Sequence, residues 1–89
     1  MRIVWDEAKR RSNLRKHELD LADAGRVFAG PTYTFEDQRF SYPEIRFITL
    51  GLLYDVVVAM AHTETRTEMR IISMRKATRH EQAIYFEKS

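Results

Sequence analysis

An uninterrupted apolar run, Val56-Val57-Val58-Ala59-Met60, is the feature that most constrains how this chain can fold. A strand with one face in solvent alternates apolar and polar residues, whereas this run presents apolar side chains to both faces. It therefore predicts a central strand that is covered, or nearly covered, on both sides. The wider apolar stretch over residues 50–61 is interrupted by Asp55 and is too short to cross a bilayer.

Other segments with strand character surround this run. A turn near residues 51–55 and a polar loop over 63–67 are hairpin-length connections, so the strands after residue 44 should pair antiparallel. Alternating and β-branched residues predict strands at 2–5, 32–36, 45–50, 56–62 and 69–74.

Caps and periodicity predict three helices. Asp6 is a suitable N-cap for a helix to about Lys16, and Asp20 for a second helix to about Phe28. The third helix covers residues 76–87. We expect a single domain over residues 1–89 with an α+β, two-layer fold: an N-terminal strand and two helices, an antiparallel β-meander and a C-terminal helix, with the helices over one sheet face.

The first helix is short of apolar residues. Ala8 and Leu14 are nearly all that it offers, so we expect it to touch the rest of the protein along one narrow stripe. Trp5, just before it, is expected in the core. Arg2, Asp6 and Glu7 interrupt any leader-like apolar run, and the chain has no cysteine, which excludes a disulfide framework. These features predict a cytoplasmic protein.

Charge is distributed unevenly although the net charge is only +2. Residues 1–17 carry six Lys or Arg against two acids, and residues 66–80 carry five against one. Residues 18–65 carry three against eight. If the fold brings the two basic ends together, they form a positive surface that attracts phosphates. The alternative is that these charges are solvated helix faces.

The available side chains favour metal-independent phosphate chemistry. Paired histidines, cysteines, a tight carboxylate cluster and a glycine-rich phosphate loop are all absent, so no metal or cofactor is predicted. RNA can be cleaved by its own 2′-hydroxyl if a protein positions groups, moves protons and neutralises developing charge. Arginine suits the last task because it stays charged and binds two phosphate oxygens, and histidine suits proton transfer.

Each candidate residue also has a structural interpretation. His17, at a basic helix end, would interact with free carbonyls and the helix dipole. Arg70 would form a surface salt bridge, for example with Glu44. Arg75 is five residues after Arg70, an odd spacing that points the two to opposite faces unless Arg75 lies past the strand end or a bulge re-aims it. Tyr85 would be a core ring with its hydroxyl at the rim.

The most specific pattern in the sequence is the string Arg70-Ile71-Ile72-Ser73 with Arg75, Ala77 and Glu81. Further positions of the same pattern are Trp5-Asp6, Lys9, Asn13, Lys16-His17, Ala24, Val27-Phe28, Glu44, Arg46, Gly51 and Tyr85. With these residues the chain resembles the BrnT family over nearly its whole length.

The resemblance implies a toxin of a type II toxin–antitoxin system with a fold similar to the RelE ribonucleases. Such proteins are metal-independent endoribonucleases that stop translation. Their antitoxin, BrnA, has a ribbon-helix-helix part, so DNA is contacted only through the antitoxin. We expect an RNA substrate, a BrnA-like partner in a complex larger than one-to-one, no cofactor and no membrane contact.

Site residues follow from the resemblance and the basic ends together. The predicted catalytic residues are His17, Arg70 and Arg75, and the predicted nucleic-acid-binding residues are Lys16, Arg46, Lys76, Arg79 and Tyr85. The chain departs from the family pattern after Lys16-His17, where Glu18-Leu19 replaces a Gly-Val turn, and at Met74, where a small residue is usual. These departures bear on the strength of the expected activity and not on its type.

Two other classes of function fit the composition and spacing. A small binding module would grip nucleic acid or a protein without chemistry, and would show salt-dependent retention on RNA or DNA with no cleavage. A plain structural subunit would show neither retention nor growth arrest. Without the family resemblance, the composition and spacing would support an enzyme and a binding module about equally.

Overall fold

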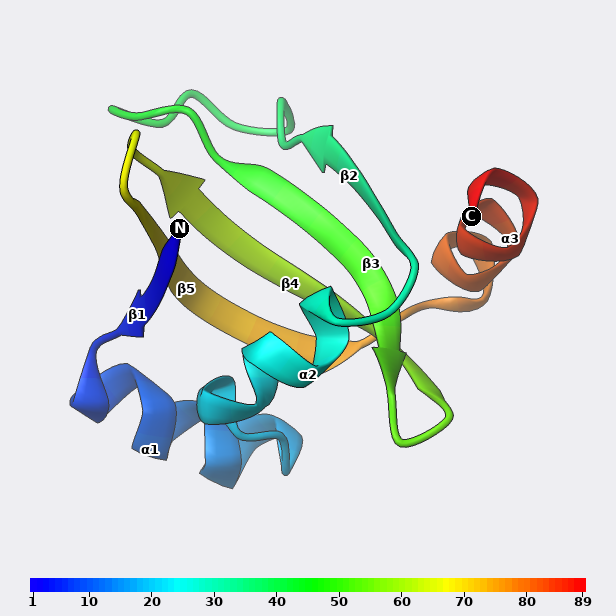
Figure 1. Ribbon diagram of the computed structural model, residues 1–89, viewed down its shortest axis with the longest axis horizontal. Coiled ribbons are helices and arrows are strands. Elements are labelled where there is room, and N and C mark those ends of the chain that lie inside the picture. Colours follow the sequence, from blue (N-terminus) through cyan, green and yellow to red (C-terminus); the bar gives the residue numbers. More distant parts are fainter.

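A five-stranded sheet forms the frame of the molecule in the computed structural model, which describes all residues 1–89 (Figure 1). The strands lie in the order β1-β5-β4-β3-β2, and every pair is antiparallel except β1 and β5. The strands are β1 (Arg2–Trp5), β2 (Thr32–Glu36), β3 (Phe47–Leu53), β4 (Val56–Glu64) and β5 (Glu68–Lys76). The helices are α1 (Glu7–His17), the 3₁₀ turn η1 (Leu21–Asp23), α2 (Ala24–Phe28) and α3 (Arg79–Lys88).

The apolar run in β4 is the central strand that the sequence predicts. Val58 and Met60 lie in a core cluster with Leu21, Ala24 and Val27, from η1 and α2. The intervening residues of β4 point to the other face and pack with α3: Val57 and Ala59 share a second cluster with Tyr85. Both faces of the strand are therefore covered, and the α+β class is confirmed.

One part of the predicted arrangement is wrong: the helices do not all cover one face. Residues of η1 and α2 pack on one side of the sheet, whereas α3 packs on the opposite side, near β2 and β3 (Figure 1). Sequence periodicity shows that a helix has an apolar stripe, but not which sheet face receives it. The helix is also shorter than expected, because Thr78 is its N-cap and residues 76 and 77 precede it.

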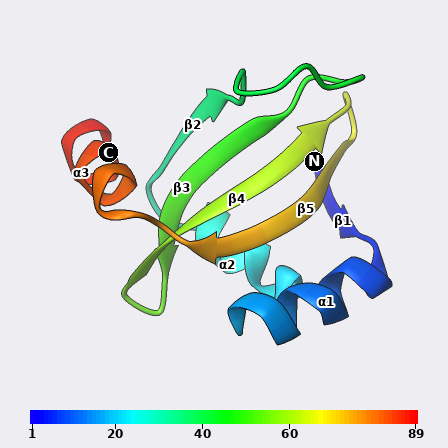
Figure 2. The ribbon, with the colours of Figure 1, turned by 180° about the vertical axis from the view of Figure 1, so that it is seen from behind.

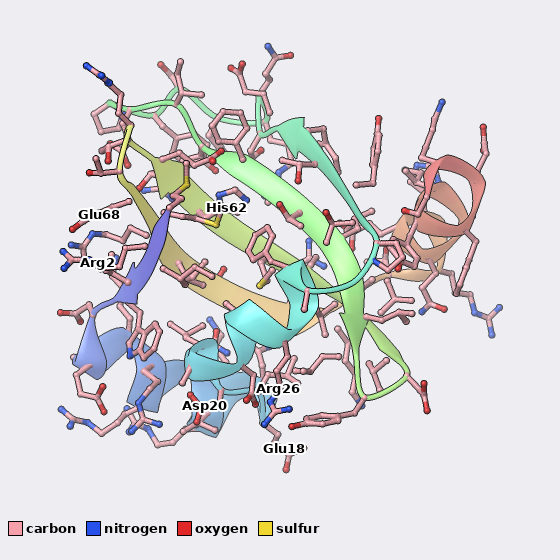
Figure 3. All side chains as sticks on the ribbon, viewed as in Figure 1. Arg2, Glu18, Asp20, Arg26, His62 and Glu68 are labelled. Carbon is pink, nitrogen blue, oxygen red and sulfur yellow. The ribbon has the colours of Figure 1, made fainter.

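The parallel strand β1 covers only the first half of β5. Its four residues pair with Glu68 to Ile71, and the ion pair between Arg2 and Glu68 lies at this end (Figure 3). Beyond Ile71 the outer edge of β5 has no strand neighbour. Helix α1 lies along this part of β5 instead, on the side away from β4 (Figure 2).

A buried asparagine joins α1 to this free edge. The Asn13 amide donates to the Met74 carbonyl at 2.9 Å, and the Met74 N–H donates to Asn13 Oδ1 at 3.0 Å. The same amide donates to the Leu19 carbonyl at 2.8 Å, which fixes the chain after the helix. Asn13 is the one buried residue of α1, so the contact stripe that we predicted to be apolar is centred on a polar side chain.

The β4–β5 pairing contains a bulge that decides where the arginines point. Ala61 pairs with Ser73 while His62 pairs with Ile71, so Ile72 has no partner of its own. Arg70 pairs with Thr63 and Arg75 pairs with Ala59, and these two β4 residues share one face. Of the two alternatives that the odd spacing left open, the bulge is correct. Arg75 lies within β5, and both arginines are on the sheet face that α3 partly covers.

Gly51 does not lie in the turn that the sequence predicts near residues 51–55. The β3–β4 turn is formed by Tyr54 and Asp55, whose φ values of 48° and 69° suit a tight hairpin. Gly51 lies inside β3, and a Cβ there would be 2.5 Å from Cγ1 of Val27. The glycine therefore allows α2 to approach the sheet closely.

Gly51→Ala should lower the free energy of unfolding by about 1–3 kcal/mol, the usual cost of forcing an extra methyl group into a packed core. Val27 is fully buried, so the added methyl group would press against a side chain of the packed core. Urea denaturation measures the change, with Gly25→Ala as the control, because a Cβ at Gly25 meets nothing within 4 Å. Equal stability of the two variants would show that α2 shifts without cost.

Candidate functional site: a basic groove between α1 and β5

Two adjoining hollows run between α1 and the free edge of β5; together we call them the α1–β5 groove. The first has a volume of about 420 Å³, within the range of small-ligand sites. The second, of about 230 Å³, shares Lys16 and His17 with the first. The first hollow is lined by Arg15, Lys16, His17, Glu18, Arg75 and Lys76. The second is lined by Lys9, Ser12, Asn13, Lys16, His17, Ile72 and Ser73.

The last turn of α1 supplies three basic residues to the first hollow. Arg15, Lys16 and His17 lie where the helix dipole and unpaired carbonyls favour positive charge, as the structural interpretation of His17 expects. The His17 ring nevertheless makes no hydrogen bond within the chain and is half-buried against the groove. It is therefore available to a ligand as well as favourably placed on the helix.

Glu18 ends α1 in a left-handed conformation. Its φ is 58°, and its N–H donates to the Leu14 carbonyl, the arrangement for which glycine is preferred. Its side chain is exposed and points away from the body of the protein (Figure 3). Glu18 thus carries backbone strain and is the only acid lining the groove.

Glu18→Gly should raise the free energy of unfolding by about 0.5–1 kcal/mol, because glycine removes the left-handed strain at some cost in chain entropy. Glu18→Ala is the matched control: it removes the same carboxylate but keeps the strain, so it should bring no such gain. Thermal denaturation of both variants makes the comparison. A gain with alanine equal to that with glycine would show that charge, not backbone conformation, limits stability here.

Arg75 is held by a double ion pair at the end of β5. Its two terminal nitrogens donate to the two oxygens of Glu81 at 2.7 and 3.0 Å. Glu81 also completes the capping box of α3, accepting from the N–H of Thr78 at 2.9 Å while Thr78 accepts from the N–H of Glu81. The Arg75 guanidinium and the helix cap lower the pKa of Glu81 to about 2. The arginine and glutamate of the specific sequence string therefore anchor α3 to β5.

Part of the Arg75 guanidinium remains free. Nη1 also donates to the Lys76 carbonyl at 3.3 Å, so three of the five N–H donors of this side chain are in use. The Nε–H and one Nη2–H have no partner. Two adjacent donors of this kind match two oxygens of a phosphate.

The structure brings four of the eight predicted site residues together. Lys16, His17, Arg75 and Lys76 all line the first hollow. Arg70 shares a sheet face with Arg75 but lies roughly 15 Å away along the strand, outside both hollows. Its suggested salt bridge with Glu44 is not formed.

The other predicted residues lie elsewhere. Arg46 stacks on Tyr42 with its guanidinium carbon 4.2 Å from the ring centre, and pairs with Glu44 at 3.4 Å. Arg79 is exposed in the first turn of α3. Tyr85 is 3% exposed, and its hydroxyl donates to the Pro31 carbonyl at 2.9 Å. This contact gives Tyr85 the core position that its structural interpretation expects.

A buried carboxylate orders the segment between β2 and β3. Asp37 accepts from Nε and Nη2 of Arg39, both at 2.9 Å, and from the Tyr42 hydroxyl at 3.1 Å. These donors lower the pKa of Asp37 to about 2. The charge of Arg39 also acts on Arg75 and Glu81 across the sheet face. Nothing in the local sequence distinguishes Asp37 from an ordinary loop acid, so its burial and its ion pair could not be predicted from the sequence.

His62 is the most enclosed titratable group of the chain. It is 1% exposed, stacks on Phe47 and meets the edge of Phe28, each with ring centres 5.8 Å apart (Figure 3). Its Nε2 shares a hydrogen bond of 2.7 Å with Thr49, which shares another of 2.7 Å with Thr34. Its Nδ1 has no partner, and burial lowers the pKa of the ring to about 4.

The structure also bears on metal binding and on membrane-spanning helices. The chain contains no group of three or more His, Cys, Asp or Glu side chains placed to hold a metal ion. None of its helices has both the length and the apolar character needed to cross a membrane.

Comparison with known proteins assigns the chain to a family. The model of the BrnT toxins, described as the ribonuclease toxin of a type II toxin–antitoxin system, matches residues 5–81. No curated protein matches the chain. The matched region extends from Trp5 to Glu81 and so includes both sides of the α1–β5 groove. The chain therefore belongs to the BrnT family of ribonuclease toxins.

Proposed function

We propose that this chain is a metal-independent endoribonuclease, and that the α1–β5 groove binds and cleaves RNA. The observation that carries the proposal is the meeting of His17, Lys16, Arg75 and Lys76 around one hollow. These residues come from the two basic ends of the chain, which the fold joins through Asn13. Family membership supports a ribonuclease and an antitoxin partner, and the groove supplies the groups that such chemistry needs.

Each residue has a distinct role in this proposal. Arg75, already oriented by Glu81, uses its two free donors to bind the scissile phosphate and neutralise its developing charge. His17 transfers a proton to or from the reacting oxygens. Lys16 and Lys76 bind the adjoining backbone, and Arg79 extends this positive surface.

Arg70 and Arg46 take flanking roles. While Arg75 stays paired with Glu81, Arg70 is too distant to hold the same phosphate, so we assign it to RNA that continues across the open sheet face. Arg46, stacked on Tyr42, would meet RNA further along. For Tyr85, the buried hydroxyl bond to Pro31 favours a structural role.

Cleavage of RNA in the presence of EDTA tests the reaction. His17→Ala should lower the rate about 10²–10⁴-fold, as expected for loss of a proton-transfer group. Arg75→Lys, which keeps a charge but loses the fork, should lower it about 10²-fold. Arg66→Ala, an exposed arginine in the loop between β4 and β5, is the control and should cleave normally. Intact RNA with the unmodified protein, together with salt-dependent binding, would indicate the non-catalytic binding module instead.

The partner is a second part of the proposal. A BrnA-like antitoxin with a ribbon-helix-helix part would cover the groove, in a complex larger than one-to-one, and any DNA would be contacted through it. An unprotected ribonuclease would be lethal in the cytoplasm, so the partner gene should be adjacent. Co-expression followed by size-exclusion chromatography measures the complex. An adjacent gene without ribbon-helix-helix character would contradict the assignment of the partner.

A further inference from the structure

The second hollow of the groove is free of acidic residues. It lies between α1 and the bulge in β5, and Lys9, Ser12 and Ser73 line it but not the first hollow. Its basic residues are Lys9 and Lys16, with His17 at the border to the first hollow. The one acid of the groove, Glu18, lines the first hollow but not this one.

Helix geometry explains why these side chains gather. Lys9, Ser12 and Lys16 are separated by three and four residues, which places them on one side of α1. The hydrogen bonds of Asn13 turn this side toward β5. The unpaired bulge residue Ile72 and the following Ser73 form the opposite wall.

The polar groups of this hollow are not satisfied within the chain. The side chains of Lys9, Ser12, Lys16 and Ser73 make no hydrogen bond and no ion pair, whereas the Asn13 amide is fully used. Two lysines with no acid lining the same hollow give it a positive potential, which attracts an anion. The volume of about 230 Å³ is below the usual range for drug-sized ligands and suits a small anionic group.

We propose that this second hollow binds the phosphodiester next to the one held by Arg75 and His17. The α1–β5 groove then holds two consecutive phosphates of one RNA strand, with Lys16 between them. This inference rests on the proposed function and names its substrate class: an oligonucleotide with at least two phosphodiesters. Lys9, Ser12 and Ser73 are positioning residues that bind backbone and take no part in proton transfer.

Binding of short uncleavable probes tests the inference. The probes are 2′-O-methyl uridine oligomers of two and three nucleotides, with one and two phosphodiesters, and their Kd is measured by NMR titration at several NaCl concentrations. The unmodified protein should bind the longer probe roughly tenfold more tightly, with a salt slope larger by about 0.7, the value for one further phosphate of a single strand. The amides of Ser12 and Ser73 should respond to the longer probe.

Matched variants show whether the second hollow causes this difference. The double variant Lys9→Ala, Ser73→Ala should lose the tenfold advantage and the added slope while binding the shorter probe normally. Lys9→Arg should keep both, and Arg66→Ala should change nothing. Retention of the advantage by the double variant, or equal loss for both probes, would overturn the inference. Inorganic phosphate binding as tightly as the longer probe would also overturn it, by identifying a site for free phosphate.

The result is independent of catalysis because the probes lack the attacking 2′-hydroxyl. A protein that shows the two-phosphate pattern but cleaves no RNA would contradict the proposed function and leave the two-phosphate groove standing. A protein that cleaves RNA without this pattern would contradict only the present inference.

Discussion

Asn13→Ala should lower the free energy of unfolding by about 3 kcal/mol, a large fraction of the stability of a domain of this size. The substitution removes three hydrogen bonds and leaves the N–H and C=O of Met74 without partners in a buried place. Each such orphaned group costs about 1–3 kcal/mol, whereas the gain from alanine in a helix is below about 1 kcal/mol. The cost of the unpaired backbone groups therefore exceeds the gain in helix propensity, and the variant is less stable.

Urea denaturation measures this loss, and Ser12→Ala is the matched control. Ser12 is exposed on the same helix and makes no hydrogen bond through its side chain, so its substitution should change stability by less than about 0.5 kcal/mol. Hydrogen exchange provides a local reading, because the Met74 amide should exchange faster in Asn13→Ala. A loss of stability below 1 kcal/mol would mean that water replaces the amide at the β5 edge.

The sequence predicts the central strand of the fold, but it does not predict the anchoring role of Asn13. The apolar run of β4 identifies a central strand because two-sided burial requires apolar residues in both registers. A buried polar residue gives no such periodic signal, so the stripe of α1 was misread as apolar. Gly51 was misplaced for a similar reason: glycine marks turns and close approaches alike, and only the position of Val27 distinguishes them.

The candidate site was partly predictable, because one of the two alternatives for the basic ends of the chain was that they form a single surface. Lys16, His17, Arg75 and Lys76 do meet, and the bulge that re-aims Arg75 was among the alternatives considered. The proximity of Lys9, Ser12 and Ser73 could not be predicted from the sequence, because it depends on the bulge and on the rotation of α1. The sequence string contains Arg75 and Glu81 but does not show how they are related. In the structure, the Glu81 carboxylate holds the Arg75 guanidinium in place.

The ion pair of Arg75 and Glu81 links the stability of the fold to the proposed RNA-binding groove. The pair fixes α3 on the sheet and also keeps an arginine fork at the end of the groove. Its strength depends on an ionised Glu81, whose pKa is lowered to about 2, so the pair persists at any pH near neutrality. A loss of stability in mildly acidic solution must therefore have another source.

That source is His62, which should make the protein less stable as the pH falls from about 6.5 to about 4. The pKa of the buried ring is lowered to about 4, whereas in the unfolded chain it has its ordinary value near 6.5. Between these values the unfolded chain binds a proton that the folded protein excludes. The contribution of the neutral His62 ring to the free energy of unfolding is therefore fully present above pH 6.5. It is lost as the pH falls to about 4, and the total loss is about 3 kcal/mol.

The carboxylates act in a separate and lower window. Asp37 and Glu81 have pKa values lowered to about 2, so their contributions remain until the pH falls below about 4. His62→Gln removes the titration but keeps an amide near Thr49, and it should make the free energy of unfolding nearly constant between pH 6.5 and 4.5. His80→Gln, at an exposed histidine, should keep the slope of the unmodified protein. Urea denaturation at several pH values compares the three proteins. If the free energy of unfolding of His62→Gln changed with pH as it does in the unmodified protein, His62 would not be the source of the pH dependence. That result would mean that the folded protein accepts a proton at His62 despite the burial of the ring between Phe28 and Phe47.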